Sequence, residues 1–253
     1  MSITASVTDH VAEVVVDVPP VNALPVAGWF ELAETITATG ADPAVHAVVL
    51  AAEGKGFNAG VDIKEMQSTA GFDALVGANR GCAAAFAAVY DCPVPVVAAV
   101  HGFCLGGGIG LVGNADIVIA SDDATFGLPE VKQGALGAAT HLSRLVPQQR
   151  MRQMMYTAER ATAQELAGYG SVLKVVPREE LRATALDVAL QIALIDPTVI
   201  RAAKASLNGI DPVDVKRSYR YEQGFTFELN LTGVSDRARD AFVDKRDAWE
   251  QEK

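Results

Sequence analysis

Residues 104–113 read CLGGGIGLVG and lie between two runs rich in β-branched residues, Val94 to Val100 and Ala115 to Ser121. Both runs are continuous rather than alternating, which is typical of strands buried on both faces of a parallel sheet. From Gly108 the segment fits the dinucleotide pattern G-x-G-x-x-G. However, only eight residues run from Gly107 to Asn114, fewer than the ~10 to 12 of a β-α-β crossover, so the spacing disfavours a dinucleotide site. Two interpretations stay open: the glycines let a short helix pack closely, or they expose backbone N–H groups to another anion.

The rest of the chain has the pattern of an α/β protein with a helical C-terminal third. The first residues have the pattern of a β-hairpin that ends before Pro19-Pro20, and a third apolar run spans His46 to Glu53. Helical periodicity predicts helices over residues 25–39, 72–90, 138–157, 162–167, 178–195 and 198–208. We expect a boundary near Asp196-Pro197, which divides the chain into a core of residues 1–195 and a helical region of residues 196–253.

Composition disfavours several classes of function. The 253 residues include 21 Lys and Arg against 31 Asp and Glu, and the formal net charge of -10 repels nucleic acid and anionic membranes. Cys82, Cys92 and Cys104 have neither metal-ligand spacing nor the even number of a disulfide framework, so we expect no metal site. The N-terminus lacks the pattern of a signal peptide, and no apolar run reaches the ~18 residues of a membrane span. We therefore expect a cytoplasmic protein without a nucleic-acid or membrane partner.

A second glycine-containing loop, GKGFNAGVDIKEM (Gly54 to Met66), follows the run that ends at Glu53. Asp62 and Glu65 have the spacing of a capping box, which predicts that a helix begins here and that the N–H of Val61 lies beside its N-terminus. Two strand ends then each offer a backbone donor. Such donors suit a developing oxyanion, because backbone amides are already oriented before the reaction.

Three segments resemble the crotonase (enoyl-CoA hydratase/isomerase) superfamily in order and spacing: GFNAGVDIKEM, residues 101–137 around the glycine loop, and AFVDKRDAW near the C-terminus. The resemblance implies a β-β-α spiral core and a C-terminal helical region that forms homotrimers, usually paired into a hexamer. It also implies an acyl-CoA thioester as substrate and no separate cofactor, since coenzyme A is part of the substrate. The two oxyanion donors of the family fall on the N–H groups of Val61 and Gly107. The anion expected at the glycine loop is therefore a thioester oxygen.

The same resemblance implies a set of residues that contact coenzyme A. Lys64 matches a basic residue near the CoA phosphates, and Lys245 matches a C-terminal lysine that reaches the nucleotide of a neighbouring subunit. A flexible point charge suits phosphate, although a solvated surface lysine is the alternative for each. Phe242 is expected along the CoA or subunit surface, with an ordinary core phenylalanine as the alternative, and Ala59 completes the expected CoA-binding set.

The chain departs from the hydratases at one of their two catalytic glutamates. The second maps onto Glu130 and is present, whereas the first maps onto Gly110. Glycine cannot hold water or transfer a proton, so the pairwise addition of water loses half of its acid/base groups. A chemistry that needs one carboxylate fits better, and three are open: double-bond isomerisation, hydrolysis with Glu130 acting on water, and C–C cleavage of a β-keto thioester through an enolate.

His141 is a candidate for an additional acid/base group. It lies in GALGAATHL, where hydratases have a glycine-rich run, and its unperturbed pKa of ~6.5 is close to working pH. The alternative is a structural histidine one turn into a helix. The structure must show whether this ring faces the substrate.

Within the superfamily, the chain is most similar to the branch of ring-opening acyl-CoA hydrolases of actinobacterial steroid (cholesterol) catabolism. The segments that carry this similarity are PPVNALPVAGWFELA, GALGAATHLSRLVP, YEQGFTFELNL and the glycine loop with Gly110. The branch implies hydrolysis of a cyclic β-keto acyl-CoA. An enoyl-CoA hydratase or isomerase of β-oxidation is the nearest alternative. An RNA-binding relative is disfavoured by the acidic charge, and an inactive trimeric scaffold is disfavoured by the retained Glu130.

Overall fold

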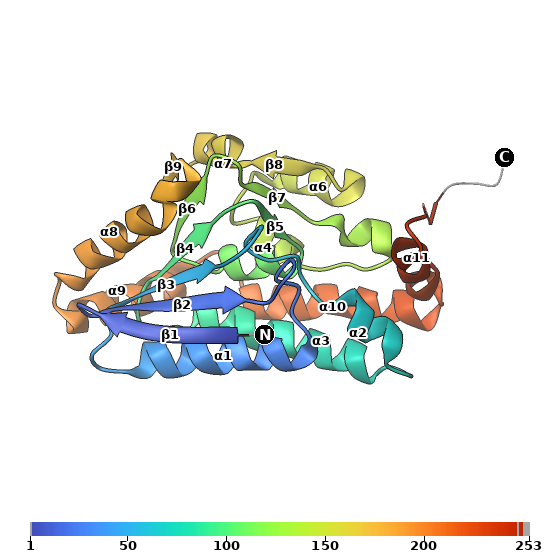
Figure 1. The fold of residues 1–253 in the computed structure, drawn as a ribbon, viewed down its shortest axis with the longest axis horizontal. Coiled ribbons are helices and arrows are strands. Elements are labelled where there is room, and N and C mark those ends of the chain that lie inside the picture. The colour runs from blue at the N-terminus through green and yellow to red at the C-terminus, as the bar shows by residue number, and fades with distance from the viewer. Residues whose placement is uncertain (1, 247, 250–253) are drawn as a thin grey trace.

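A six-stranded sheet forms the centre of the molecule in the computed structural model, which describes residues 2–246 and 248–249 (Figure 1). Its order is β1-β2-β3-β4-β6-β9; β1 and β2 are antiparallel, and the other neighbours are parallel. The strands are β1 (Ser2–Thr8), β2 (Val11–Asp17), β3 (Ala47–Ala52), β4 (Val96–Val100), β6 (Ile117–Ser121) and β9 (Lys174–Val176). The expected hairpin and the three expected buried strands are confirmed, and so is the α/β class.

The central strands are apolar throughout because both faces of the sheet are covered. Val48 and Leu50 of β3 face a layer that contains α1 (Val26–Ala41) and α3 (Asp73–Tyr90). Ala47 and Val49 of the same strand belong to a second apolar cluster, with α8 (Leu181–Ala193) on the opposite face. Figure 1 shows α8 on one side of the sheet and α1 on the other. Successive side chains of a strand point to opposite faces, so a two-sided core requires a continuous apolar run.

The glycine loop joins two different sheets. β5 (Phe103–Leu105) pairs with β7 (Thr125–Gly127) in a three-stranded sheet that also contains β8 (Arg160–Thr162). The six-residue helix α4 (Gly107–Val112) follows, and the chain then enters β6 of the larger sheet. The segment is therefore not a β-α-β crossover within one sheet, which explains why its spacing is too short for a dinucleotide fold.

The prediction of one continuous helix over residues 138–157 is wrong in the middle of that range. Residues 138–157 form two helices, α5 (Ala139–Leu142) and α6 (Gln148–Thr157), and Pro147 stands at the start of the second with extended backbone angles. Val146 precedes this proline, and the residue before a proline is disfavoured in the helical region. Leu145 and Val146 are buried in the main core, which explains why they continued the apolar pattern of a helix.

The remaining helices lie where the sequence predicted them or extend that prediction, except η1, which was not predicted. They are α2 (Ile63–Ser68), η1 (Pro129–Gln133), α7 (Ala163–Tyr169), η2 (Arg178–Glu180), α9 (Pro197–Ile210), α10 (Val215–Leu231) and α11 (Val234–Val243). Asp196 begins α9 as its N-cap, where its carboxylate accepts from Thr198 N. The division of the chain at this residue into a core and a helical region stays a prediction.

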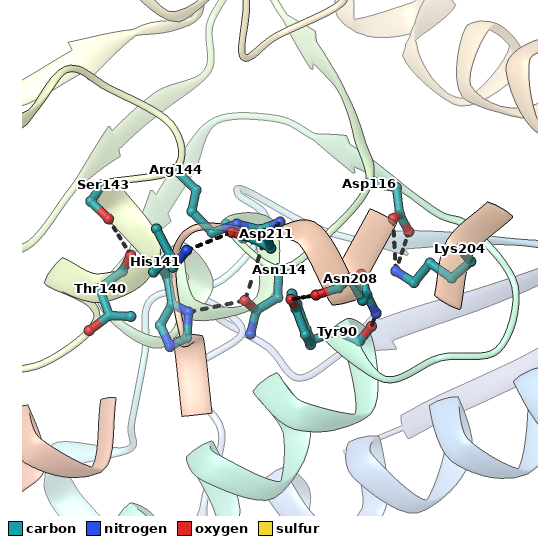
Figure 2. A network of polar contacts seen from close by, with 12 residues as sticks. Tyr90, Asn114, Asp116, Thr140, His141, Ser143, Arg144, Lys204, Asn208 and Asp211 are labelled. Carbon is teal, nitrogen blue, oxygen red and sulfur yellow. Dashed lines mark hydrogen bonds and ion pairs between the residues drawn. The ribbon is translucent and has the colours of Figure 1, made fainter. Parts of the chain in front are cut away.

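Helix α9 is attached to the core by polar contacts that cross the expected boundary (Figure 2). Lys204 is 3% exposed, and its Nζ donates to both carboxylate oxygens of Asp116 at 2.8 and 2.7 Å. Tyr90 and Asn208 exchange two bonds: the Tyr90 hydroxyl donates to the Asn208 carbonyl at 3.1 Å, and Asn208 Nδ2 donates to the Tyr90 carbonyl at 2.7 Å. These contacts fix the C-terminal helices against α3 and the loop before β6.

No single helix within residues 2–246 is both long enough and apolar enough to cross a membrane. The segments Arg178–Ala193 and Pro197–Ile210 reach that length and composition only as a pair, and they are bent by 107° relative to each other.

Replacing Lys204 by Met should lower the free energy of unfolding by about 3 kcal/mol, because a charge on Asp116 would lose its buried partner. Lys216→Met is the control, since the pair of Lys216 and Asp91 is about half exposed on both sides and should contribute less than about 1 kcal/mol. Urea unfolding of both variants measures the difference. Equal destabilisation by the two substitutions would contradict the docking role of Lys204.

Candidate active site

A cavity of about 370 Å³ opens where the two glycine-containing loops meet α3, α10 and α11. Of the residues predicted to form the site, it is lined by Ala59, Val61, Gly107, Glu130 and Phe242. Most of the wall is apolar; this part includes Ile63, Met66, Leu75, Ala78, Phe86, Leu136, Ala138 and Tyr219. The cavity is therefore suited to a largely apolar group that presents a few polar atoms at one end.

Two short parallel bridges hold the loops in place. Leu24 pairs with Val61, because Leu24 N donates to the Gly60 carbonyl and Asp62 N donates to the Leu24 carbonyl, both at 2.9 Å. In this pattern the N–H of Val61 itself points away from Leu24. The second bridge joins Asn58 to Cys104 at the end of β5.

The N–H groups of Val61 and Gly107 are both uncommitted. Neither donates to another group of residues 2–246 and 248–249. They lie on neighbouring strand ends, since a Cβ placed on Gly60 would lie only 3.3 Å from Gly107 N. Two free donors at the wall of one cavity can bind an oxygen that becomes negative during a reaction.

The glycines of the loop are required by space as well as by backbone angle. Gly106 has a φ of 56°, and a side chain there would collide with the carboxylate of Glu130. A side chain on Gly107 would collide with the ring of Trp29, which is fully buried beneath the loop. The packing interpretation and the donor interpretation of the loop are thus compatible, because the absent side chains let the donors and the carboxylate approach each other.

The expected capping box is half formed. Asp62 Oδ1 accepts from Lys64 N at 2.9 Å and from Glu65 N at 3.4 Å, so the predicted N-cap is confirmed. The prediction of the reciprocal bond is wrong: the Glu65 carboxylate accepts from Val26 N at 2.7 Å instead of accepting from the backbone N–H of Asp62. This contact joins the start of α2 to the start of α1, and α2 then supplies one wall of the cavity.

Glu130 lies in η1 and brings a carboxylate to the cavity beside the glycine loop. Its Oε2 atom is buried and has no hydrogen-bond partner within the described residues. Burial raises the pKa of this carboxyl to about 8, the nearby charge of Glu222 adds to the increase, and the residue's own backbone N–H opposes it. A group with a pKa near neutrality can both accept and donate a proton under ordinary conditions.

The position of the missing glutamate is filled by Phe86 of α3. A side chain on Gly110 would collide with the Phe86 ring, which is 2% exposed and lines the cavity. The same ring packs edge-on against Trp29, with the ring centres 5.7 Å apart. Restoring a glutamate at Gly110 would therefore require Phe86 to move, and the site has an aromatic surface where a second carboxylate would stand.

His141 lies behind the cavity rather than in its wall. It lines a separate cavity of about 190 Å³, and the rings of Phe86 and Tyr219, which line both cavities, stand between His141 and the larger one. Nδ1 lies 3.1 Å from Asn114 Oδ1, and the Asn114 amide nitrogen donates to the Phe86 carbonyl, so Nδ1 is assigned the proton. Nε2 is buried without a partner within the described residues. Burial, with a smaller effect of Arg144, lowers the pKa of His141 to about 3, so the ring is neutral at ordinary pH.

The residues expected to contact coenzyme A lie around the mouth of the cavity or outside it. Phe242 of α11 is 51% exposed and lines the cavity together with Ala59. Lys64, on α2, and Lys245, just after α11, are exposed and do not line the cavity. Helices α2 and α11 are neighbours, and Gln67 donates to Asp240 between them at 2.5 Å. Both lysines therefore belong to one end of the molecule.

Sequence reasoning missed several residues of the wall. Phe86 and Tyr219 separate the two cavities, and Glu222 sits on the same helix as Tyr219. Periodicity predicts that such positions face the core, but it does not say which core residues from α3 and α10 meet at η1. The three cysteines are free and buried, and Cys82 lines the cavity. Within the described residues, no three His, Cys, Asp or Glu side chains group as ligands of a metal ion.

Glu130 should make stability depend on pH. Its pKa in the folded protein, about 8, is above the ordinary value of 4.5, so its contribution to stability is complete below about pH 4.5 and is lost as pH rises through about 8. We expect the free energy of unfolding to fall over this range in the wild type and to fall less in Glu130→Gln. Urea unfolding at several pH values measures both slopes. Identical slopes in the two proteins would show that folding does not raise the pKa of the Glu130 carboxyl.

Comparison with known proteins places this site in a family. The family model of enoyl-CoA hydratase/isomerase matches residues 6–252. A protein of Rhodococcus jostii (strain RHA1), named (7aS)-7a-methyl-1,5-dioxo-2,3,5,6,7,7a-hexahydro-1H-indene-carboxyl-CoA hydrolase, is 66% identical over 96% of this chain and 95% of its own. A protein of the same name from Mycobacterium tuberculosis (strain ATCC 25618 / H37Rv) is 62% identical over 97% of this chain and 100% of its own.

The fold agrees with the same family. The crystal structure of an enoyl-CoA hydratase/isomerase from Xanthobacter autotrophicus Py2 superposes with a TM-score of 0.86, covers 99% of this chain and 98% of its own, and is 28% identical. The expected crotonase-type fold is thus confirmed, and the chain belongs to the enoyl-CoA hydratase/isomerase family.

Proposed function

We propose that this protein is an acyl-CoA hydrolase that opens a ring of a bicyclic β-keto thioester, like the hydrolases whose name specifies a hexahydroindene-dione carboxyl-CoA. One observation carries the proposal: two uncommitted N–H groups and a single carboxyl group lie on the wall of one apolar cavity. This set can hold a thioester enolate and move one proton, which is what hydrolytic C–C cleavage requires. The identities of 66% and 62% to the two hydrolases support the substrate class.

The proposed reaction begins with water. Glu130 takes a proton from water as its oxygen bonds to a ring ketone carbon. The bond between that carbon and a neighbouring ring carbon that is conjugated with the thioester then breaks, and its electron pair is delocalised onto the thioester oxygen as an enolate. The N–H groups of Val61 and Gly107 stabilise the enolate oxygen. Glu130 returns its proton to the carbon framework of the enolate, so the products are a carboxylic acid and a new C–H bond, with one water consumed.

Hydration of an enoyl thioester is disfavoured by Phe86. Addition across a double bond by the family's paired glutamates needs a second carboxylate, and an aromatic ring fills the space beside Gly110. An aromatic wall suits a fused carbocycle, which is rigid and apolar apart from its ketone oxygens. The geometry therefore favours the ring-opening hydrolase over the hydratase or isomerase that was the alternative.

The CoA part of the substrate is proposed to lie between α2 and α11. Ala59 and Phe242 would contact the pantetheine arm at the mouth of the cavity, and Lys64 and Lys245 would contact the phosphates. His141 was predicted as a further acid/base group, and that prediction stays open. Its place behind Phe86 and Tyr219 supports a structural role in which the ring holds Asn114.

We also propose that the chain assembles into trimers or hexamers and works in a reducing compartment such as the cytoplasm. Apolar side chains are exposed on the C-terminal helices; they include Val199, Leu207, Ile210, Tyr221, Phe225, Leu231 and Val243. Exposed groups of this kind are typical of surfaces that pair with another chain. The free thiols of Cys82, Cys92 and Cys104 support the compartment.

The proposed function is tested by mass spectrometry of the products from two thioesters. With the hexahydroindene-dione carboxyl-CoA we expect a gain of about 18 mass units, which is one water, together with ring opening, and with crotonyl-CoA we expect turnover at least about 10²-fold slower. Glu130→Gln keeps the shape of the side chain but cannot accept the proton, so it should lower kcat by about 10² to 10⁴ with little change in KM. Fast hydration of crotonyl-CoA by the wild type would restore the hydratase interpretation.

The oxyanion donors are best tested at Val61. Substitution at Gly107 would also push on Trp29, whereas Val61→Pro removes an N–H that the bridge to Leu24 does not use. We expect turnover to fall by about 10² to 10³ in Val61→Pro. Val61→Ala is the matched control, because it shortens the side chain and keeps the N–H. If both variants are equally active and folded by circular dichroism, the oxyanion assignment fails.

A further inference from the structure

We propose that Glu222, on the C-terminal helix α10, is a positioning residue for Glu130: its negative charge favours the protonated form of the Glu130 carboxyl at the cavity wall. The inference rests on the proposed function, in which Glu130 is the single group that accepts and returns the proton. It places a carboxylate that acts together with Glu130 on α10, whereas in hydratases the partner of this glutamate stands at the position of Gly110.

One oxygen of Glu222 is fixed by Thr140, the second residue of α5. Oε1 accepts from Thr140 N at 2.6 Å and from the Thr140 hydroxyl at 3.0 Å. Thr140 is 7% exposed and follows Ala138, which lines the cavity and has a φ of 60°. Donors to an oxygen favour its charged form, so these two bonds favour ionisation of Glu222.

The other oxygen of Glu222 is buried and unsatisfied. Oε2 has no hydrogen-bond partner within the described residues. On the same helix, Tyr219 is three residues before Glu222 and Thr226 is four residues after it, and both line the cavity with Glu130. Residues at this spacing share one face of a helix, so Glu222 projects from the same face of α10 as two residues of the cavity wall, without lining the cavity itself. A carboxylate with a buried, unused oxygen is costly, which is typical of a group retained for function.

Glu222 acts on Glu130 through charge. Burial is the main cause of the raised pKa of Glu130. The charge of Glu222 is a smaller cause that also raises this pKa. Burial also raises the pKa of Glu222, and the bonds from Thr140 oppose that increase. We infer that Glu222 ionises first, because it has two donors from Thr140, whereas Oε2 of Glu130 has no partner among the residues that the structure describes.

The other titratable groups around Glu130 do not replace this effect. Burial raises the pKa values of the Cys82 thiol and the Tyr219 hydroxyl, so both stay neutral at ordinary pH. Arg160 and Arg239 line the same cavity, but neither forms an ion pair with Glu130 within the described residues.

Lys132, in η1 itself, is exposed, and two arginines on helices that pack against η1 have partners of their own. Arg239, on α11, is bound to Asn230 and Asp236. Arg150, on α6, which also packs against η1, is paired with Glu159 and Glu165.

The consequence for the reaction is a carboxyl that can work in both directions. The proposed cleavage needs Glu130 ionised to accept a proton from water and protonated to return it to the enolate. A pKa near neutrality makes both forms accessible. A carboxylate with an ordinary pKa would be a weaker base than Glu130, so it would take the proton from water less readily. Glu222 thus supplies by charge part of what a second glutamate in contact with the substrate supplies in hydratases.

The test is a titration without substrate. The infrared carbonyl band of a protonated carboxyl is followed against pH in the wild type, and the part that disappears in Glu130→Gln is assigned to Glu130. We expect a midpoint at about pH 8 in the wild type. In Glu222→Gln, which keeps an oxygen for Thr140, the midpoint should fall by at least about half a pH unit. Glu228→Gln, an exposed change on the same helix, should leave it unchanged.

An unchanged midpoint in Glu222→Gln overturns the inference, since a purely structural Glu222 would not move it. If that variant does not fold, Glu222→Asp and Glu222→Asn give the same comparison with matched shapes, and only Glu222→Asn should lower the midpoint. The acid limb of kcat/KM should move with the infrared midpoint. A shift in midpoint without turnover of the bicyclic thioester would contradict the proposed function alone, whereas turnover without a shift would contradict this inference alone.

Discussion

The close approach of two backbones at Gly60 and Gly107 is the contact on which the site depends. A Cβ on Gly107 would lie 3.5 Å from Gly60 Cα and would collide with Trp29, and a Cβ on Gly106 would collide with Glu130. With no side chains between them, two strand ends from separate parts of the chain bring their N–H groups to one point. Backbone amides held in this way need no rearrangement when charge develops beside them, and that is why an oxyanion site can be built from glycine and valine.

The surroundings of Glu130 are unfavourable for charge, and this property suits the proposed chemistry. Apolar walls favour the neutral carboxyl, and so does the absence of a partner for Oε2 in the described part of the chain. The folded state is less stable at high pH for that reason, because the charged form must be buried. Sites that transfer protons are commonly built at such a cost, since the same burial that destabilises the charge brings the pKa toward the pH of the reaction.

The C-terminal helices contribute to the site as well as to the surface. Tyr219 and Thr226 come from α10, and Phe242 comes from α11, so the cavity is incomplete without residues beyond the expected boundary. Lys204 joins α9 to Asp116 next to the central sheet. The position of these helices therefore affects both the shape of the cavity and the charge beside Glu130. If the chain forms trimers, the same helices link assembly to the geometry of the site.

The sequence by itself determined the features that depend on neighbouring residues and on backbone periodicity. The central strands, the N-cap at Asp62, the glycine loop and the backbone donor of Val61 could all be found in this way, since apolar runs, caps and loop glycines act over a few residues. Glu130 was predicted only from the resemblance to the family. Only the tertiary structure decided that Phe86 fills the space beside Gly110, that Glu65 binds Val26 N, and that His141 lies behind an aromatic layer. The physical reason is that these contacts join segments from about 24 to 55 residues apart, and their geometry is set by how helices pack on the sheet, which no local pattern records.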